Sequence, residues 1–266
     1  MKFERVELVK GRENVWLDCY IADKLSRKRK AIMVIPGGAY AKVCSDREGE
    51  PIAQAFMPYG FNAFVLNYSV GEGNATFPQP LIEASLAMKH IKDNAEEYGI
   101  DADNVFAVGF SAGGHLCAAL GTMWHLESVN SAIDMPFGYN KPKGIVPVYP
   151  VISSDNSIWN KKSFENIAGV NAGQEAYDRV SPLRYVSETS SPAFIVHTFQ
   201  DTMVDVRNSI VLANAYAEHK VPFELHIFEK CEHGMALANN ITNPGYGNPH
   251  NAKWVELAAE WMADLK

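Results

Sequence analysis

The sequence predicts an α/β fold with a mainly parallel sheet and helices on both faces. From residue 31 onward, short apolar runs alternate with segments whose apolar residues recur at helical spacing. Such alternation is typical of parallel strands joined by helical crossovers. Two segments of alternating polarity, near 2–9 and 14–21, precede the first helix, so we expect them to form an antiparallel edge of the sheet.

The expected elements follow one another along the chain. Apolar runs predict strands at 31–36, 61–66, 105–110, 144–149 and 193–199, and alternating polarity predicts a strand at 223–228. Helical spacing predicts helices at about 50–57, 79–96, 111–122, 207–219 and 250–265. The basic segment from Lys24 to Lys30 lies between two strands, where we expect an exposed hairpin turn.

Length and composition favour a single domain over residues 1–266. Hydrophobic residues make up 47% of the chain and charged residues 21%, which are ordinary values for a protein with a large core. The region 152–190 breaks the alternation and is rich in Asn, Ser and Lys. It is a candidate lid or pocket wall, and a surface excursion with short helices is the alternative.

The segment from Val105 to His115 contains a glycine-flanked serine directly after an apolar strand. Ser111 stands between Gly109 and Gly113 in the pattern Gly-x-Ser-x-Gly, and a helix is expected next. A serine in this context lies on a tight turn that raises its hydroxyl above the sheet edge, so its neighbours must lack bulk. Because the pattern arises by chance in roughly one chain of this length in ten, other segments must support it.

An acid and a base occupy matching positions further along. Asp201 lies just past the strand 193–199, and His233 lies in the loop after the strand 223–228. The chain order Ser, Asp, His is that of the α/β-hydrolases, and open α/β sheets bind ligands at the carboxyl ends of their strands. We therefore expect Ser111 as nucleophile, His233 as its base and Asp201 as the carboxylate that orients the histidine.

Other carboxylates and histidines compete for these roles. Asp205 also follows the strand that precedes Asp201, but it stands at the start of the next helix, where an aspartate acts as a cap or dipole partner. His115, one turn after Ser111, is expected to point away from that serine and to be structural. His250 is expected to be exposed. Structural or surface roles are also commoner for the histidines within expected elements or at their ends: His90, His125, His197, His219 and His226.

A glycine-rich loop upstream is the candidate oxyanion hole. The strand 31–36 runs into Gly37-Gly38-Ala39-Tyr40. Loops in this position present backbone N–H groups to an oxyanion. We expect the donors to be the N–H groups of Gly38 and Ala39 and that of Ala112, which follows the nucleophile. An alanine at position 39 requires a φ that suits an L-residue.

The segment Ser45-Asp-Arg-Glu48 fits a helix capping box. Pro51 offers an alternative start for the same helix. A position at the edge of the pocket is a second alternative for Ser45 or Glu48.

These segments together resemble the short-chain carbohydrate-esterase-like branch of the α/β-hydrolase superfamily, which includes acetylxylan-esterase-like proteins. The resemblance extends from about residue 30 to the C-terminal helix. It is carried by Pro36–Tyr40, Ser45–Glu48, Phe64–Tyr68, Gly109–His115, Tyr149-Pro150 and the run from Ser181 through Asp201 to Gly234. The resemblance implies a serine esterase that acts on small acyl groups and needs no cofactor.

Charge and cysteine usage exclude several other classes of function. A net charge of −7 argues against nucleic acid or an anionic membrane as partner. The N-terminus lacks the apolar core of a signal peptide, and no apolar run reaches the ~18 residues of a membrane span, so we expect a cytoplasmic protein. The scattered cysteines Cys19, Cys44, Cys117 and Cys231 form no CxxC pair, so we expect free thiols and no metal site.

The resulting hypothesis is a serine esterase that hydrolyses short-chain acyl esters of carbohydrates, acetyl esters above all, through a Ser-His-Asp triad and an acyl-enzyme. The expected partner is a small-molecule or oligosaccharide ester. An amidase or peptidase on the same triad is the alternative among enzymes, and a non-catalytic binding protein with this fold is the alternative outside them. The sequence leaves the oligomeric state open.

Overall fold

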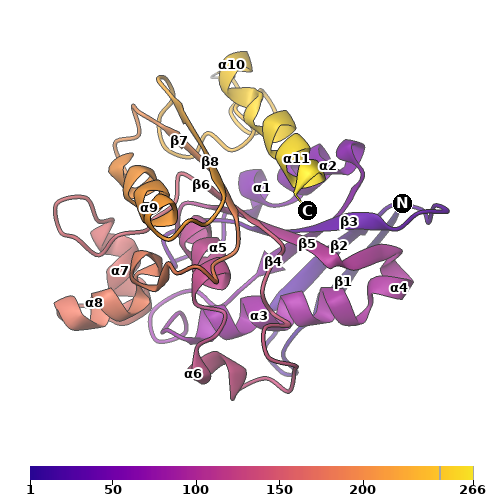
Figure 1. Ribbon diagram of the computed structural model, residues 1–266, viewed down its shortest axis with the longest axis horizontal. Coiled ribbons are helices and arrows are strands. Elements are labelled where there is room, and N and C mark those ends of the chain that lie inside the picture. The colour runs from indigo at the N-terminus through magenta and orange to yellow at the C-terminus, as the bar shows by residue number, and fades with distance from the viewer. Residues whose placement is uncertain (246, 266) are drawn as a thin grey trace.

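The computed structural model describes residues 1–245 and 247–265. Eight strands form one twisted sheet in the order β1-β2-β4-β3-β5-β6-β7-β8 (Figure 1). The strands are β1 (Lys2–Glu7), β2 (Trp16–Ile21), β3 (Arg29–Ile35), β4 (Phe61–Asn67), β5 (Ile100–Phe110), β6 (Ile145–Val148), β7 (Ala193–Thr198) and β8 (Phe223–Phe228).

The pairing of the strands confirms the predicted sheet. β1 pairs with β2, and β2 with β4, in antiparallel register. All remaining neighbours, from β4 across to β8, are parallel. The carboxyl ends of the parallel strands therefore lie along one edge of the sheet, and the loops after them can meet there.

Helices connect the strands and cover both faces of the sheet. The α-helices are α1 (Ser45–Glu48), α2 (Glu50–Phe56), α3 (Gln79–Asp93), α4 (Ala95–Tyr98), α5 (Ala112–Thr122), α6 (Glu127–Asn130), α7 (Lys161–Ala168), α8 (Gln174–Val180), α9 (Arg207–Glu218), α10 (Pro249–Ala252) and α11 (Trp254–Asp264), and the 3-10 helices are η1 (Met57–Tyr59) and η2 (Pro182–Tyr185). No described helix is long and apolar enough to cross a membrane.

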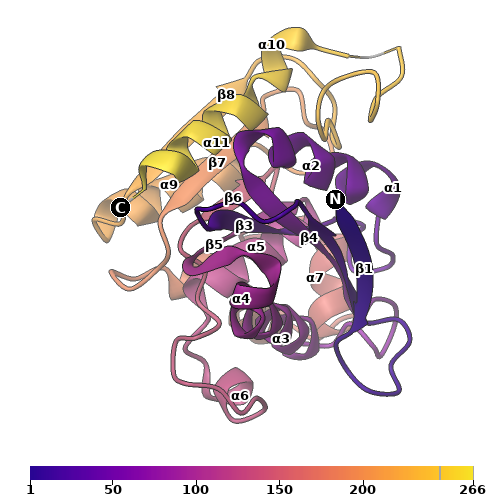
Figure 2. The same ribbon diagram turned by 90° about the vertical axis from the view of Figure 1, so that its right-hand side faces the viewer.

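Two apolar cores lie on the two faces. Helices α2 and α11 pack on one face, and α3 and α5 pack on the other (Figure 2). Helix α9 also lies on the face of α3 and α5, across β7 and β8 from α11 (Figure 1). Along β5, Val105 and Ala107 point into one core, while Phe106, Val108 and Phe110 point into the other. Because both faces are covered, the central strands read as continuous apolar runs, which is why the sequence pattern predicted them.

The expected hairpin at Lys24–Lys30 is wrong. β4 lies between β2 and β3 in the sheet, so the segment connects two strands that are not neighbours. β2 pairs with β1 on one side and with β4 on the other, so it has no free edge for β3. The Nζ of Lys30 instead donates to the carbonyl oxygens of Met262 and Ala263 at 2.6 and 2.8 Å, at the C-terminal end of α11, where a cation is favourable.

Two expected helices are each divided in two. The helix predicted at 79–96 ends at Asp93, and the short helix α4 follows Asn94. The Asn94 side chain donates to the carbonyl oxygen of His90 at 2.8 Å and so competes with continued helical bonding. The helix predicted at 250–265 is α10 followed by α11. The insert 152–190 contains α7, α8 and η2.

Candidate active site

Ser111 occupies a strained turn between β5 and α5. Its φ and ψ are 54° and −116°, a backbone conformation that L-residues rarely adopt. A Cβ on Gly109 would lie 2.2 Å from the carbonyl oxygen of Gly113, and a Cβ on Gly113 would lie 2.1 Å from that of Ile35. Backbone atoms thus occupy the space of any side chain at these two positions. The glycines are what allow the turn to close around Ser111.

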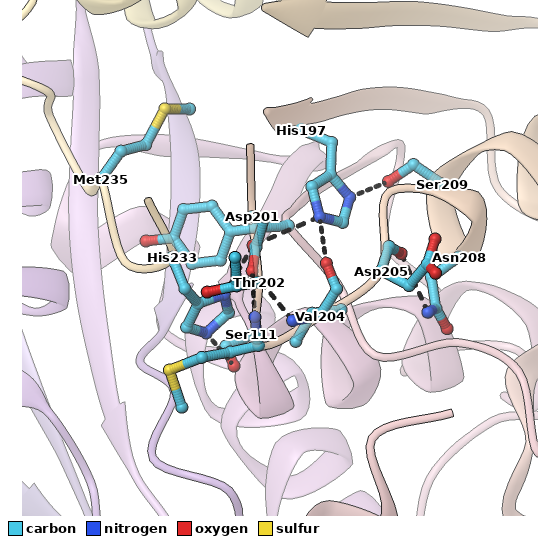
Figure 3. Close-up of polar contacts among 12 residues, drawn as sticks. Ser111, His197, Asp201, Thr202, Val204, Asp205, Asn208, Ser209, His233 and Met235 are labelled. Carbon is cyan, nitrogen blue, oxygen red and sulfur yellow. Dashed lines mark hydrogen bonds and ion pairs between the residues drawn. The ribbon is translucent and has the colours of Figure 1, made fainter. Parts of the chain in front are cut away.

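In the structure, two consecutive hydrogen bonds link the side chains of Ser111, His233 and Asp201 in that order, and we call this arrangement the hydrogen-bonded row (Figure 3). The Ser111 hydroxyl lies 2.9 Å from His233 Nε2. The Nδ1 of His233 lies 2.7 Å from Asp201 Oδ2. The three residues come from the loops after β5, β7 and β8, whose carboxyl ends share one edge of the sheet. A hydroxyl, an imidazole and a carboxylate in this order can activate an oxygen nucleophile.

The loop after β7 holds the Asp201 carboxylate in place. Oδ1 accepts the backbone N–H groups of Met203 and Val204 at 2.9 and 2.8 Å, and the side chain has no exposed surface. Burial by itself raises the pKa of Asp201, but polar contacts with His197 and His233 outweigh it and hold the pKa well below its usual range. The carboxylate is therefore ionised next to His233.

His197, which was expected to have only a structural or surface role, is a further residue of this network. Its Nε2 donates to the Val204 carbonyl oxygen at 3.0 Å and lies 3.3 Å from Asp201 Oδ2, while Nδ1 accepts from the Ser209 hydroxyl at 2.7 Å (Figure 3). The available signal was a histidine in an apolar strand, four residues before Asp201.

Asp205 lies outside the row. Its carboxylate accepts the backbone N–H of Arg207, the first residue of α9, at 2.9 Å, and pairs with the Arg207 guanidinium at 2.6 Å. The side-chain hydrogen bond and the charge of Arg207 hold the pKa of Asp205 below its usual value. The structure therefore places Asp201, and not Asp205, against His233.

The loop after β3 lies beside Ser111. Within the described residues, the N–H groups of Gly38, Ala39 and Ala112 have no hydrogen-bond acceptor. The expectation that position 39 has a φ suited to an L-residue is wrong, because Ala39 and the next residue, Tyr40, have φ values of 55° and 57°. The loop turns so tightly that the N–H groups at positions 41 and 42 both donate to the Gly38 carbonyl oxygen.

Glu48 does not form the expected capping box. The helix α1 begins after Cys44 and has no side-chain cap. Pro51 lies in the first turn of the next helix, α2. Glu48 turns inward and accepts the backbone N–H of Gly37 at 2.8 Å. Both alternatives at this segment are therefore observed: a helix starts beside Pro51, and Glu48 lies at the pocket.

A pocket of about 490 Å³ opens above Ser111. Its lining comes from the loop after β3, from α1, from the row of polar residues and from the insert: Gly38, Ala39, Ala41, Lys42, Cys44, Arg47, Glu48, Ser111, Asn160, Ser163, Met203 and His233. The insert thus contributes part of one wall. Asn166 of α7 also donates to the Ala39 carbonyl oxygen at 2.7 Å, which ties the insert to the loop after β3.

His115 points away from Ser111, as expected. Its Nδ1 accepts from the Tyr40 hydroxyl and its Nε2 donates to the Val180 carbonyl oxygen, both at 2.7 Å. Burial lowers the pKa of His115 to about 4, so the ring is neutral. His250 is exposed, also as expected.

All four cysteines are free thiols, and Cys231 is partly exposed while the other three are buried. Among the described residues, no three His, Cys, Asp or Glu side chains gather into a group that could hold a metal ion. Burial raises the pKa of the Cys44 thiol, which lies nearest to the pocket, so this group is protonated at neutral pH.

Two relatives are similar over about four fifths of the chain. Endo-1,4-beta-xylanase B of Butyrivibrio fibrisolvens is 35% identical over 216 residues, which are 80% of this chain and 33% of that protein. The acetylxylan esterase of Xylanibacter ruminicola is 28% identical over 225 residues, which are 82% of this chain and 43% of that protein. The chain therefore spans less than half the length of either relative.

Solved structures match almost the whole chain. The acetyl ester-xyloside bifunctional hydrolase of Caldicellulosiruptor lactoaceticus is 31% identical with a TM-score of 0.85, covering 98% of this chain and 95% of its own. An α/β hydrolase from a deep-sea metagenome is 30% identical with a TM-score of 0.79, and the match covers 100% of this chain and 98% of that chain. By fold, the protein is an α/β-hydrolase. The BD-FAE family model matches residues 17–216, and the chain belongs to that family.

Proposed function

We propose that the protein is a serine esterase that hydrolyses short-chain acyl esters, acetyl esters above all, of carbohydrates. The observation that carries the proposal is the hydrogen-bonded row from Ser111 through His233 to Asp201, which lies beside three backbone N–H groups that have no acceptor among the described residues. A nucleophile with its base and a set of free donors is what acyl transfer to water requires.

Each residue of the row has a defined part in the reaction. As Ser111 Oγ attacks the acyl carbon, its proton passes to His233 Nε2. The oxyanion that forms is bound by the N–H groups of Gly38, Ala39 and Ala112. Collapse of this intermediate breaks the bond to the alcohol, which leaves with the proton from His233. The ionised Asp201 keeps the His233 proton on Nδ1 and stabilises the imidazolium.

Water completes the cycle at the same groups. His233 takes a proton from a water molecule as its oxygen attacks the acyl-enzyme, and the same backbone donors bind the second oxyanion. Collapse then breaks the bond to Ser111 Oγ, which recovers its proton from His233, and the carboxylic acid is released. No electron transfer is needed and water is the second substrate, so this proposal includes no cofactor.

The substrate class rests on the relatives and on the pocket. Relatives named acetylxylan esterase and acetyl ester-xyloside hydrolase support an acetylated saccharide. Lys42 and Arg47 line the pocket and can bind sugar hydroxyls, while its lining, as far as the described residues form it, lacks large aromatic or branched aliphatic side chains that would hold a fatty chain. In this proposal the insert 152–190 forms one wall of the pocket within a single domain.

A panel of substrates tests the function. We expect a higher kcat/KM for p-nitrophenyl acetate than for the octanoate, and release of acetate from acetylated xylo-oligosaccharides. Each methylene that fits an apolar pocket adds roughly 1 kcal/mol of recognition, so a lipase-like site would show the opposite trend. Ser111→Ala is expected to lower kcat at least ~10³-fold, while Ser157→Ala, at an exposed serine of the insert, stays within about twofold.

Other outcomes of the same panel identify the alternatives. Rates that rise with chain length while acetylated oligosaccharides stay intact would reject a carbohydrate esterase. Faster hydrolysis of p-nitroacetanilide than of the acetate ester would identify an amidase. Saccharide binding without any turnover would identify a binding protein.

A further inference from the structure

Glu48 is a buried carboxylate beside the pocket, and the reaction described above gives it no role. It is 2% exposed and lies at the end of α1. Its Oε2 accepts the backbone N–H of Gly37, the residue before the expected oxyanion donors, at 2.8 Å. Its Oε1 accepts the hydroxyl of Tyr149 at 2.9 Å.

Tyr149 continues this contact to the loop that carries His233. The tyrosine follows β6 and is fully buried. Its hydroxyl accepts the backbone N–H of Ala236, three residues after His233, at 3.1 Å. Its ring packs edge-on against the His233 imidazole, with 5.0 Å between ring centroids and an interplanar angle of 67°.

A continuous set of hydrogen bonds therefore joins the two loops on either side of Ser111. It runs from the N–H of Gly37 to Glu48, from Glu48 to Tyr149, and from Tyr149 to the N–H of Ala236. The Trp254 indole donates to the Ala236 carbonyl oxygen at 2.8 Å, so both backbone polar groups of Ala236 are bonded. One loop carries the expected oxyanion donors and the other carries the expected base.

The bonding pattern favours an ionised Glu48. Both of its oxygens face donors, because the Tyr149 hydroxyl already accepts from Ala236 and has its proton free for the carboxylate. Burial raises the pKa of Glu48, while the Gly37 hydrogen bond and the Arg47 guanidinium, whose Nε lies 3.9 Å from Oε1, oppose the rise. A charge is costly to bury, so a neutral side chain would serve better if only packing were needed here.

We propose that Glu48 and Tyr149 are positioning residues for ester hydrolysis. They hold the loop of Gly38 and Ala39 at a fixed distance from the loop of His233, so that the oxyanion donors and the base act on the same acyl carbon. This inference rests on the proposed function. Because both the acylation and the deacylation steps use these groups, loss of the link slows both steps and leaves substrate binding largely intact.

The test compares two variants with two matched controls. Tyr149→Phe keeps the ring against His233 and removes the hydroxyl, and Glu48→Gln keeps the shape and removes the charge. Tyr216→Phe is the control for the tyrosine, because Tyr216 is fully buried and its hydroxyl makes one hydrogen bond, to the Ser191 carbonyl oxygen. Glu83→Gln is the control for the glutamate.

Glu83 matches Glu48 closely in its surroundings but lies outside the pocket. It lies in α3, has no exposed surface and accepts a backbone N–H, that of Ser69 just after β4, at 2.7 Å. It does not line the pocket of Ser111. A merely structural effect of removing a buried charge or hydroxyl should therefore appear in the controls as well.

We expect Tyr149→Phe and Glu48→Gln each to lower kcat for p-nitrophenyl acetate by about 10- to 100-fold, with KM within about twofold of the wild type. The double variant should lose no more than the worse single variant, because the two residues act as one unit. The controls should keep kcat within about twofold. Stopped-flow traces should show acylation and deacylation slowed together.

Specific results would overturn the proposal. A folded Tyr149→Phe enzyme with wild-type kcat would refute it even if Glu48→Gln failed to fold, and so would control variants that lose as much kcat. An effect confined to KM would indicate substrate contact in place of positioning. A wild-type protein without any ester turnover would reject the proposed function itself, and the positioning role with it.

Discussion

Two nearby aspartates differ because their hydrogen-bond partners differ. Asp201 is buried and bonded to His233, whereas Asp205 pairs with Arg207 at the start of α9. We expect Asp201→Asn to lower kcat by about 10⁴-fold, because an amide favours the wrong histidine tautomer. Asp205→Asn should stay within about threefold, since asparagine also accepts a backbone N–H near a helix start. Steady-state measurement of kcat for the two variants tests this expectation. A larger loss in Asp205→Asn than in Asp201→Asn would identify Asp205 as the carboxylate that orients His233.

His115 makes stability depend on pH. Its pKa of about 4 in the folded protein lies below the ~6.5 of an unfolded chain, so the unfolded state takes up a proton first on acidification. The contribution of His115 to stability is complete above pH ~6.5 and is lost as the pH falls to about 4. It amounts to at most about 3 kcal/mol.

Urea unfolding at several pH values tests this contribution. The free energy of unfolding of His115→Asn should fall less steeply than that of the wild type between pH 7 and pH 4.5. His219→Asn, at an exposed histidine, should follow the wild type. Parallel pH dependence of all three proteins would contradict the assignment to His115.

At the scale of elements, the turn from β5 into α5 depends on Gly109 and Gly113. A Cβ on Gly113 would collide with backbone oxygens of Ile35 and Pro36 at 2.1 and 2.4 Å. A Cβ on Gly121, in the same helix, would meet the Ile145 side chain at 2.9 Å, and that side chain can move. We expect Gly113→Ala to cost more than about 4 kcal/mol of stability, because strand β3 would have to shift.

Gly121→Ala is the control, and it should stay within about 1 kcal/mol, since the gain in helix propensity offsets a small shift of Ile145. Thermal unfolding of both variants is the measurement. A Gly113→Ala protein that unfolds at the wild-type temperature would show that the turn tolerates a side chain.

The elements also show which parts of the secondary structure the local sequence is sufficient to predict. The central strands were predicted nearly at their observed positions, since burial on both faces of a parallel sheet leaves continuous apolar runs. The breaks at Asn94 and before α11 were missed, because helical spacing continues across them. The hairpin at Lys24–Lys30 was wrong, since which strands become neighbours depends on contacts with β4 that the local sequence does not contain.

At the scale of the whole molecule, the proposed reaction draws its groups from four separate loops. The oxyanion donors follow β3 and β5, and the nucleophile, acid and base follow β5, β7 and β8. Since the proposed nucleophile is a serine oxygen and the proposed oxyanion donors are backbone N–H groups, we expect full activity after dialysis against EDTA. Loss of ester hydrolysis that zinc or another divalent ion restores would contradict this mechanism.

The sequence by itself determined the fold class, the antiparallel edge and the positions of Ser111, Asp201 and His233 after strands, because these features depend on local pattern and chain order. The catalytic roles of these three residues are proposed, and the experiments described above would test them. Only the tertiary structure decided which aspartate meets His233, the positive φ of Ala39 and the inward turn of Glu48. Glu48 bonds to residues 11 and 101 positions away, and contacts between such distant segments leave no periodic trace in a single sequence.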